Sequence, residues 1–468
     1  MAAFAVVVLA ASCTSSADAG QGDVGRADIN IITTVLDPVD PVDRLDPLQL
    51  PVVEISDSTT SSTSSTTTTS TTTTSTTEQP SDTTVAPNTT VAPTTSLPVT
   101  STTAISGIPP WQIGLLNTES SVSGSFQAFR HGVEAAVGWW NDSAAATGGR
   151  GIALVSCAGT DAVSTVACAE ELVSSSDAII HGIDLFSELS IPIIEQGSVP
   201  VLGGMAVRSV DAFAANAGLD VGGPPAAHAA LAQRVIDEGH SNVVVFHDDT
   251  DIGFEMIDVF VRPILEAAGV VVTLLPVPVA TSDSTGVVAP LAPNVADSWI
   301  VATSESSCGS IATSRAQLGL TIKIVWSTSC ATDGVFDNFG ELMAGDEIAF
   351  ELVEPRLFDY VSSDLRAGYE LANQVLLQHE TSPADDPLAL RGWLVGTRLV
   401  QTLERGTTDL VASRDVRGPN PLGAGEIACG ANATAVCSGD VMFFGWDGET
   451  IRPPMSLANG LGSIEEVS

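Results

Sequence analysis

Basic residues are scarce in this sequence. Lys and Arg together number 17 against 56 Asp and Glu, Lys323 is the only lysine, and the formal net charge is −39 at pH 7. Such a chain has little with which to neutralise phosphate groups. The composition therefore argues against nucleic acid as a partner and against docking on anionic lipid through a basic patch. With 468 residues, 44% of them hydrophobic, the chain is long enough to bury a substantial core.

Long apolar runs are also absent, since no apolar stretch reaches the roughly 18 residues without charge of a transmembrane helix. A short apolar segment occupies residues 2–11, and we expect a signal peptide over residues 1–13. Its end, LAASC, resembles a bacterial lipobox, in which the cysteine, here Cys13, is lipidated. An ordinary cleaved export signal with an incidental cysteine is the alternative. We expect an extracytoplasmic protein anchored to the outer face of the cell membrane by a lipid.

Residues 14–110 have the composition of a disordered linker. An acidic stretch with prolines comes first, and Ser and Thr then supply 20 of the 23 residues from 58 to 80. A tract with so few apolar side chains cannot offset the entropy cost of ordering its backbone. We expect this linker to hold the folded part away from its anchor.

Six cysteines remain besides Cys13, and they fall into three pairs that are close in the sequence. An even set of cysteines in an exported protein indicates disulfides. Proximity favours the pairs Cys157–Cys168, Cys308–Cys330 and Cys429–Cys437 among the many pairings that are possible. Zinc is disfavoured because there is no Cys-x-x-Cys and the histidines lack ligand spacing.

Short β-rich runs alternate with helix-period segments from residue 111 onward. Continuous apolar strands between such helices are typical of parallel sheets covered on both faces. Two units of this kind follow each other, at about 111–230 and 231–345. The expected strands are 113–116, 152–156, 178–181, 199–202, 242–247, 270–275, 299–302, 322–326 and 441–446. Two further helices are expected at 363–379 and 387–406, and residues 456–468 resemble a tail.

Motifs for catalysis are missing. The sequence has no complete Gly-x-Ser-x-Gly, His-Glu-x-x-His or Walker A motif, and no Gly-x-Gly-x-x-Gly follows a strand. Asp248, Asp249 and Asp251 could be read as a metal cluster, but acids at the end of a strand more often cap a helix or contact a ligand. We interpret His247 as a solvated loop residue. We therefore expect no enzymatic activity, no cofactor and no metal.

Four stretches together resemble the type 1 periplasmic-binding fold, specifically the Leu/Ile/Val-binding-like solute receptors of ABC importers. They are 113–141 (IGLLNTESSVSGSFQAFRHGVEAAVGWWN), 151–182, 242–260 (NVVVFHDDTDIGFEMIDVF) and 308–330, followed by 429–451. The resemblance implies two lobes, each a parallel sheet covered by helices, with a ligand cleft between them. Lobe 1 would comprise about 111–230 and 346–425, and lobe 2 about 231–345 and 426–455.

The same resemblance implies capture of a small polar solute by lobe closure and its delivery to a membrane permease, without chemistry. An amino acid, an amide or a carboxylate would fit. The contacts it implies are Ser121, Ser123, Asp184, Ser187, Gly204 and Met205 in lobe 1, and Asp251, Ser327 and Ser329 in lobe 2. We expect a monomer. A sensory ectodomain acting through a partner, a surface adhesin on a Thr-rich stalk and an exported hydrolase are the alternatives.

Overall fold

The computed structural model describes residues 108–121, 124–147, 149–291, 296–379, 386–429 and 434–464. The chain divides into two units, 1–89 and 90–468, and every described residue belongs to the second. The predicted signal peptide, Cys13 and nearly all of the predicted linker lie outside the described residues.

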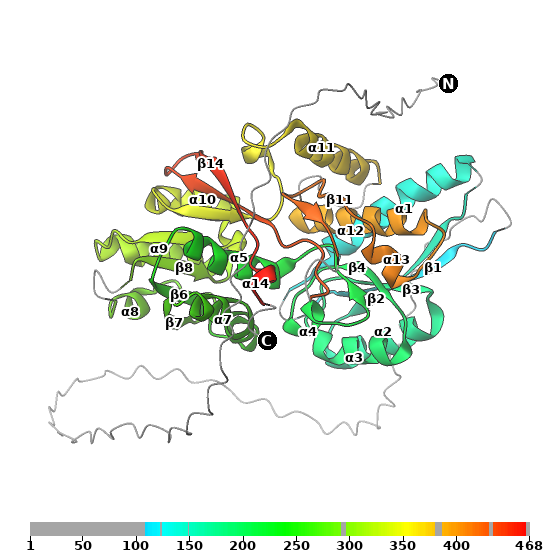
Figure 1. Cartoon of the computed structure of the whole chain (residues 1–468), viewed down its shortest axis with the longest axis horizontal. Helices are drawn as coiled ribbons and strands as arrows, with labels where there is room; N and C mark the ends of the chain where they lie inside the picture. The colour runs from blue at the N-terminus through cyan, green and yellow to red at the C-terminus, as the bar shows by residue number, and fades with distance from the viewer. Residues whose placement is uncertain are drawn as a thin grey trace, which may run out of the picture. The chain divides into compact units, whose positions relative to one another are not determined.

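A sheet of five parallel strands, in the order β2-β1-β3-β4-β5, forms the first lobe. Its strands are β1 (Trp111–Thr118), β2 (Ile152–Gly159), β3 (Ala178–His181), β4 (Val201–Gly204) and β5 (Ala217–Gly218). Figure 1 shows its two layers of helices, which pack on opposite faces of the sheet. One layer holds α1 (Gln127–Thr147), α11 (Ser363–Gln378) and α12 (Pro387–Leu403), and the other holds α2 (Ala162–Ser175) and α3 (Ser187–Gly197).

The second lobe is built on a seven-stranded sheet in the order β14-β13-β10-β9-β8-β6-β7. The strands are β6 (Asn242–Asp248), β7 (Val271–Val277), β8 (Ser298–Ala302), β9 (Lys323–Trp326), β10 (Glu347–Phe350), β13 (Val441–Trp446) and β14 (Ile451–Ala458). Strands β6 to β10 run parallel, whereas β13 is antiparallel to both of its neighbours. This sheet therefore consists of the parallel strands β6 to β10, extended beyond β10 by β13 and β14, which are paired antiparallel.

Helices also cover both faces of the second sheet. One face packs against α5 (Gly223–Asp237), α6 (Asp251–Met256), the π-helical turn η1 (Ile257–Val261) and α7 (Arg262–Ala267). The other packs against α8 (Thr285–Val288), α9 (Glu305–Gln317) and α10 (Asp333–Phe339). The shorter elements are α4 (Ser209–Ala212), η2 (Thr328–Cys330), η3 (Gly340–Met343), η4 (Pro355–Leu357), α13 (Leu410–Arg414), α14 (Leu461–Ile464) and the pair β11 (Gly418–Pro419) and β12 (Glu426–Ile427).

The predicted α/β class, with parallel sheets covered by helices, is confirmed. All three predicted disulfides are present, with Cα–Cα distances of 5.5, 5.7 and 3.9 Å. Among the described helices none is both long and apolar enough to cross a membrane.

Two segments differ from the sequence expectations. Residues 347–350 form β10 beside β9, so the chain leaves the second sheet after Phe350 rather than near 345. Part of the expected tail is folded, because β14 extends to Ala458 and Leu461 of α14 is completely buried. The largely exposed stretch between Ile451 and Ala458 hides the role of β14 as an edge strand, which pairs with β13 in the described sheet.

Close packing between α1 and α12 depends on glycine. A Cβ at Gly392 would lie 1.9 Å from the Phe129 carbonyl oxygen, and a Cβ at Gly132 would lie 2.0 Å from that of Ala389. These contacts let the two helix backbones approach each other directly. The helix pair covers β1, whose carboxyl end bears the first ligand loop predicted from the sequence.

We predict that Gly392→Ala lowers the free energy of unfolding by about 1–3 kcal/mol, because the helices must separate to admit the methyl group. Urea unfolding measures the change. The matched control is Gly286→Ala in α8, where a Cβ meets no atom within 4 Å. This control should be neutral or slightly stabilising. Equal stability of Gly392→Ala and the wild type would contradict the prediction.

Candidate functional site

The carboxyl edge of the first sheet carries two loops that are tied together. Asn117, near the end of β1, is 1% exposed, and its Oδ1 accepts the backbone N–H of Ile183 at 3.0 Å. Ser121 and Gly124 pair through their backbones, and the Ser121 hydroxyl donates to the Gly124 carbonyl at 2.8 Å. Predicted contact Ser123 lies outside the described residues. The loop after β1 is thus fixed to the loop after β3.

A buried histidine between two aspartates lies directly behind this edge. His181 ends β3 and is completely buried, while Asp184 and Asp211 are 1% and 0% exposed. The His181 Nε2 lies 3.4 Å from Asp184 Oδ2, and its Nδ1 lies 3.9 Å from Asp211 Oδ1. The imidazole therefore faces a carboxylate at each nitrogen.

The two aspartates also hold the neighbouring loops. Asp184 Oδ1 accepts the backbone N–H of Phe186 at 2.8 Å, and Asp211 Oδ2 accepts those of Val207 and Arg208, each at 2.8 Å. These residues belong to the loops that follow β3 and β4. A single buried group of charges thus positions two loops of the first lobe.

The pKa directions follow from this arrangement. Burial alone lowers the pKa of His181, but the hydrogen bond to Asp184 and the charge of Asp211 outweigh it, so the pKa is raised. Burial raises the pKa of Asp184, yet its contacts with His181 lower it overall. For Asp211 burial dominates and the pKa is raised. The two aspartates therefore favour the charged form of His181.

The structure places the other predicted first-lobe residues at this edge in different environments. Ser187 is completely buried at the start of α3, behind the loops. Gly204 has φ of +142°, and a Cβ there would lie 2.0 Å from the His181 carbonyl oxygen. Met205 donates its backbone N–H to the same oxygen at 3.0 Å. Asp184 and Ser187 thus lie in the interior, while the backbone of Gly204 and Met205 lies at the carboxyl end of β4.

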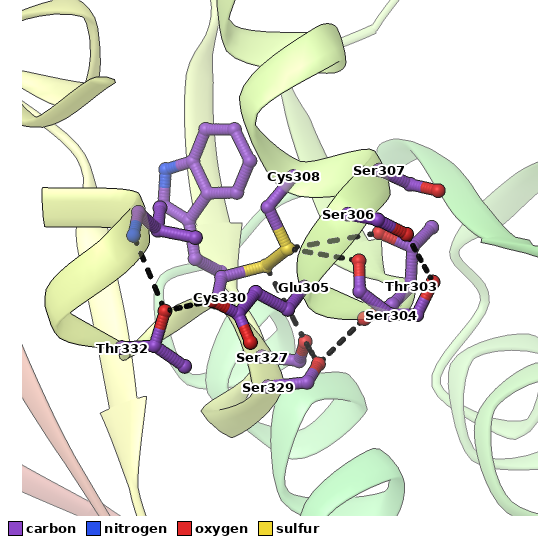
Figure 2. The surroundings of a disulfide bond; sticks show 12 residues. Thr303, Ser304, Glu305, Ser306, Ser307, Cys308, Ser327, Ser329, Cys330 and Thr332 are labelled. Carbon is purple, nitrogen blue, oxygen red and sulfur yellow. Dashed lines mark hydrogen bonds between the residues drawn. A yellow bond between two sulfur atoms is a disulfide. The ribbon is translucent and has the colours of Figure 1, made fainter. Parts of the chain in front are cut away.

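Hydroxyl groups and a disulfide hold the carboxyl edge of the second sheet (Figure 2). Ser329 donates to the Thr303 carbonyl at 2.5 Å, and its hydroxyl lies 2.7 Å from that of Ser327. The Cys308–Cys330 disulfide joins α9 to η2 beside them. The ends of β8 and β9 are therefore cross-linked, and predicted contacts Ser327 and Ser329 lie together at this cross-link.

The acidic segment after β6 divides into two roles. Asp248 accepts the backbone N–H of Ser304 at 2.8 Å and its hydroxyl at 3.1 Å, so it ties β6 to β8. Asp251 is exposed at the start of α6, and its carboxylate makes no hydrogen bond or ion pair within the described residues. The Asp249 carboxylate is likewise exposed and makes no hydrogen bond or ion pair within the described residues, so the segment has two unengaged carboxylates.

The acids of this segment do not gather as a metal site would. In the described part of the chain, the His, Cys, Asp and Glu side chains that lie close enough together to hold a metal ion are those of Asp220, Cys429 and Cys437. Both cysteines are in a disulfide, so this group offers a single carboxylate and no thiolate.

The interpretation of His247 as a solvated loop residue is wrong, because this side chain lies on β6 and is completely buried. Its Nδ1 lies 3.0 Å from the Asp248 carbonyl oxygen, and its ring packs edge-on against Phe254 at 4.7 Å between centroids. Burial lowers the pKa of His247, so the ring is neutral. The expected strand 242–247 already contained this residue, and a neutral histidine is compatible with the core.

Sequence reasoning missed the ion pairs that join the two lobes. Arg208 donates from Nε to Glu255 at 2.6 Å, and the backbone N–H and hydroxyl of Ser209 donate to the other oxygen, each at 2.6 Å. Burial raises the pKa of Glu255, but these donors outweigh burial and lower it. Arg391 of α12 likewise donates to Glu351 at 2.9 Å. The rarity of basic residues in this sequence could have marked these arginines as candidates for ion pairs between the lobes.

A family described as periplasmic binding protein matches residues 110–345. No curated protein sequence matches the chain.

Solved structures of similar fold cover most of the chain. A leucine-binding protein, LivK, from Thermotoga maritima is 17% identical with a TM-score of 0.55, covering 75% of this chain and 99% of that one. A solute-binding protein of an ABC transporter from R. palustris, in complex with 4-hydroxybenzoate, is 16% identical with a TM-score of 0.56, covering 75% and 98%. A fatty acid ABC transporter substrate-binding protein from Thermomonospora curvata is 15% identical with a TM-score of 0.55, covering 77% and 94%. At such identities the likeness shows the fold alone.

We predict that the stability difference between the wild type and His181→Gln falls as the pH rises above about 6.5, the pKa of an unfolded histidine. The native state keeps the His181 proton that the unfolded chain releases, so the loss is up to about 1.4 kcal/mol per pH unit until the folded pKa is passed. Urea unfolding of both proteins across this pH range measures it. The comparison removes the contributions of His131, His228 and His247, whose lowered pKa values act in the opposite direction. A difference that does not change with pH would contradict the role of His181.

Removal of the Cys308–Cys330 disulfide by a double substitution to Ser should lower the free energy of unfolding by about 3 kcal/mol, given its sequence separation of 22 residues. It should also speed amide exchange in residues 327–333. The control replaces Cys157 and Cys168, which should lower stability without altering exchange at 327–333. Unchanged exchange in the first variant would refute the cross-linking role.

Proposed function

The chain belongs to the periplasmic binding protein family, and we propose that it is the extracytoplasmic solute-binding subunit of an ABC importer. The observation that carries this proposal is the contact between the loops of the two lobes, where Arg208 and Ser209 of the first lobe bind Glu255 of the second. A solute between the lobes favours their closed arrangement, because only there does it touch both. Binding therefore requires no chemical step.

A solute that carries a carboxylate fits the chemistry of the two edges. We propose that hydroxyls near the ends of β1 and β9, those of Ser121, Ser327 and Ser329, bind the anion without a cation. The backbone N–H groups of residues 205–209 after β4 already donate within the protein. The solved relatives named above include a leucine-binding protein, a protein in complex with 4-hydroxybenzoate and a fatty acid transporter protein. Leucine, 4-hydroxybenzoate and fatty acids all carry a carboxylate, which supports this class.

The predicted first-lobe residues have two proposed roles: some contact the solute, and others position the loops that contact it. The proposed first-lobe contacts are Ser121, Ser123 and the main chain of Gly204 and Met205. Asp184 and Ser187 are buried, and we assign to them the positioning of those loops.

In the second lobe Asp251 is the proposed partner of a solute ammonium group, because its carboxylate is exposed and unengaged within the described residues. Ser327 and Ser329 are proposed hydroxyl contacts beside it.

Export and anchoring belong to the same proposal. The three disulfides support an oxidising compartment. Cys13 is the proposed lipid-bearing residue, and the Ser/Thr-rich linker is the proposed spacer between membrane and receptor. A solute-binding protein anchored in this way stays beside its permease.

A thermal-shift screen of the oxidised protein tests the function. Leucine, 4-hydroxybenzoate and medium-chain fatty acids are compared with their amides or methyl esters. A true solute at one hundred times its Kd should stabilise the protein by about 2.7 kcal/mol. The uncharged derivatives should fail, because they lack the carboxylate. Binding of esters as strong as that of the acids would exclude the carboxylate class, and no stabilisation by any solute would favour a sensory or adhesive role.

If the solute is an amino acid, Asp251→Ala should weaken its binding about tenfold or more through loss of a charge-assisted hydrogen bond. Titration calorimetry measures the affinity, and urea unfolding confirms that the variant is folded. The matched control is Asp258→Ala two turns further along the same helical segment, where the carboxylate pairs with Arg262 at 2.8 Å. Equal affinities for Asp251→Ala and the wild type would remove Asp251 from the site.

A further inference from the structure

A groove on the first lobe is lined by arginines that the proposed function does not use. One face of α12 and the turn after it form one wall, and residues 416–421, which include β11, form the other. The groove has a volume of about 580 Å³. Figure 1 shows α12, α13 and β11 grouped on this lobe.

Basic residues are concentrated around this groove. Four of the 17 basic residues of the chain lie between 398 and 417, against three acids in the same stretch. Arg398, Arg405 and Arg417 all line the groove. In a chain with more than three acids for every base, this is a marked local exception.

Two of these arginines are almost unengaged. Arg417 is exposed and has no hydrogen bond or ion pair within the described residues. Arg405 is exposed as well, and its guanidinium makes one hydrogen bond, to the Ala412 carbonyl at 3.5 Å. Their N–H groups are free to bind oxygen atoms in the groove. Glu404 is the acid that lines it and opposes an anion.

The floor of the groove is rigid. Arg398 is 6% exposed and donates to the Val416 carbonyl at 2.6 Å and to Gln401 at 2.8 Å. Its Nε lies 3.6 Å from Asp220, in the segment between β5 and α5 that connects the two lobes. Burial raises the pKa of Asp220 to about 6, although Arg398 opposes the shift. Arg398 is thus a fixed cation that joins both walls and the interlobe connection.

We propose that this groove binds a compact oxyanion with two or more negative groups, either carboxylate or phosphate. Arg405 and Arg417 bind the anion from the two walls, and Arg398 contributes a fixed positive charge beneath it. Guanidinium groups suit this role because they donate paired hydrogen bonds to carboxylate and phosphate oxygens. None of the residues that line the groove is a proposed solute contact.

The net charge of the protein does not prevent such binding. At physiological ionic strength the field of distant carboxylates is screened beyond about 8 Å. Three arginines and Glu404 line the groove, and Asp220 lies behind it, 3.6 Å from Arg398. Three positive charges against two negative ones leave the immediate surroundings of the groove positive. An anion that reaches the groove is therefore attracted by its immediate surroundings.

The test is titration calorimetry of the full-length oxidised protein with citrate and, separately, with pyrophosphate, in a low-salt buffer without other multivalent anions. Saturable binding of citrate alone would identify a carboxylate ligand, and that of pyrophosphate alone a phosphate ligand. Binding should weaken about tenfold or more in the double variant Arg405→Gln/Arg417→Gln. Glu404→Gln should strengthen it, because the opposing charge is removed.

Arg262→Gln on α7 is the control, because it removes one positive charge outside the groove from an exposed ion pair. Its anion affinity should equal that of the wild type. The absence of saturable binding to both anions would overturn the proposal. Equal weakening by Arg262→Gln and the groove variant would overturn it too, because binding would then depend on overall charge. The outcome is independent of whether any solute binds between the lobes.

Discussion

The shortage of cations constrains this structure more than any other property. Residues 111–468 carry 45 acids and 15 bases, so about three carboxylates compete for each cation. Several arginines therefore lie where two segments meet. Arg208 joins the lobes through Glu255, and Arg391 does so through Glu351. Arg234 reaches both Glu347 and Glu238, at 2.7 and 2.9 Å. Partly buried pairs of this kind are worth more than exposed ones, so they contribute most at such junctions.

Arg130 holds the loop after β1 through Glu119, Arg208 holds the loop after β4 through Glu255, and other groups hold the rest of these loops. In the first lobe His181 lies between two aspartates, and the carboxylates of these aspartates accept hydrogen bonds from backbone N–H groups of the loops. In the second lobe the Cys308–Cys330 disulfide and the hydroxyls of Ser327 and Ser329 perform the same task. Both arrangements fix the loop backbone through buried groups.

The sequence predicts the strands of the sheets well because their apolar runs are continuous, and residues 178–181 and 441–446 have the predicted bounds. The sequence does not predict an element whose structure depends on pairing with another strand. Strand β10 is only four residues long and is fixed by β9 and β13, and the exposed residues of β14 obscure its pairing with β13. The site shows the same division. Spacing along the chain locates Asp184 beside the edge, but only the packing of His181 and Asp211 shows that it is buried. Arg208 and Glu255 are 47 residues apart, and no local pattern connects them.

This distribution of charge explains why the two proposed anion sites differ in chemistry. Arg208 and Arg391, which join the lobes, are already paired with carboxylates, so an anion bound between the lobes would rely on hydroxyls such as those of Ser327 and Ser329. Those dipoles are fixed by the histidine cluster and the disulfide, and they need little reorganisation when a ligand arrives. In the groove beside α12 the opposite holds, because Arg405 and Arg417 have almost no partners of their own. Attraction there comes from full charges at an exposed surface, which salt screens strongly. A chain so poor in cations leaves two of them nearly unpaired in one groove, and this is the reason to regard that groove as a binding surface.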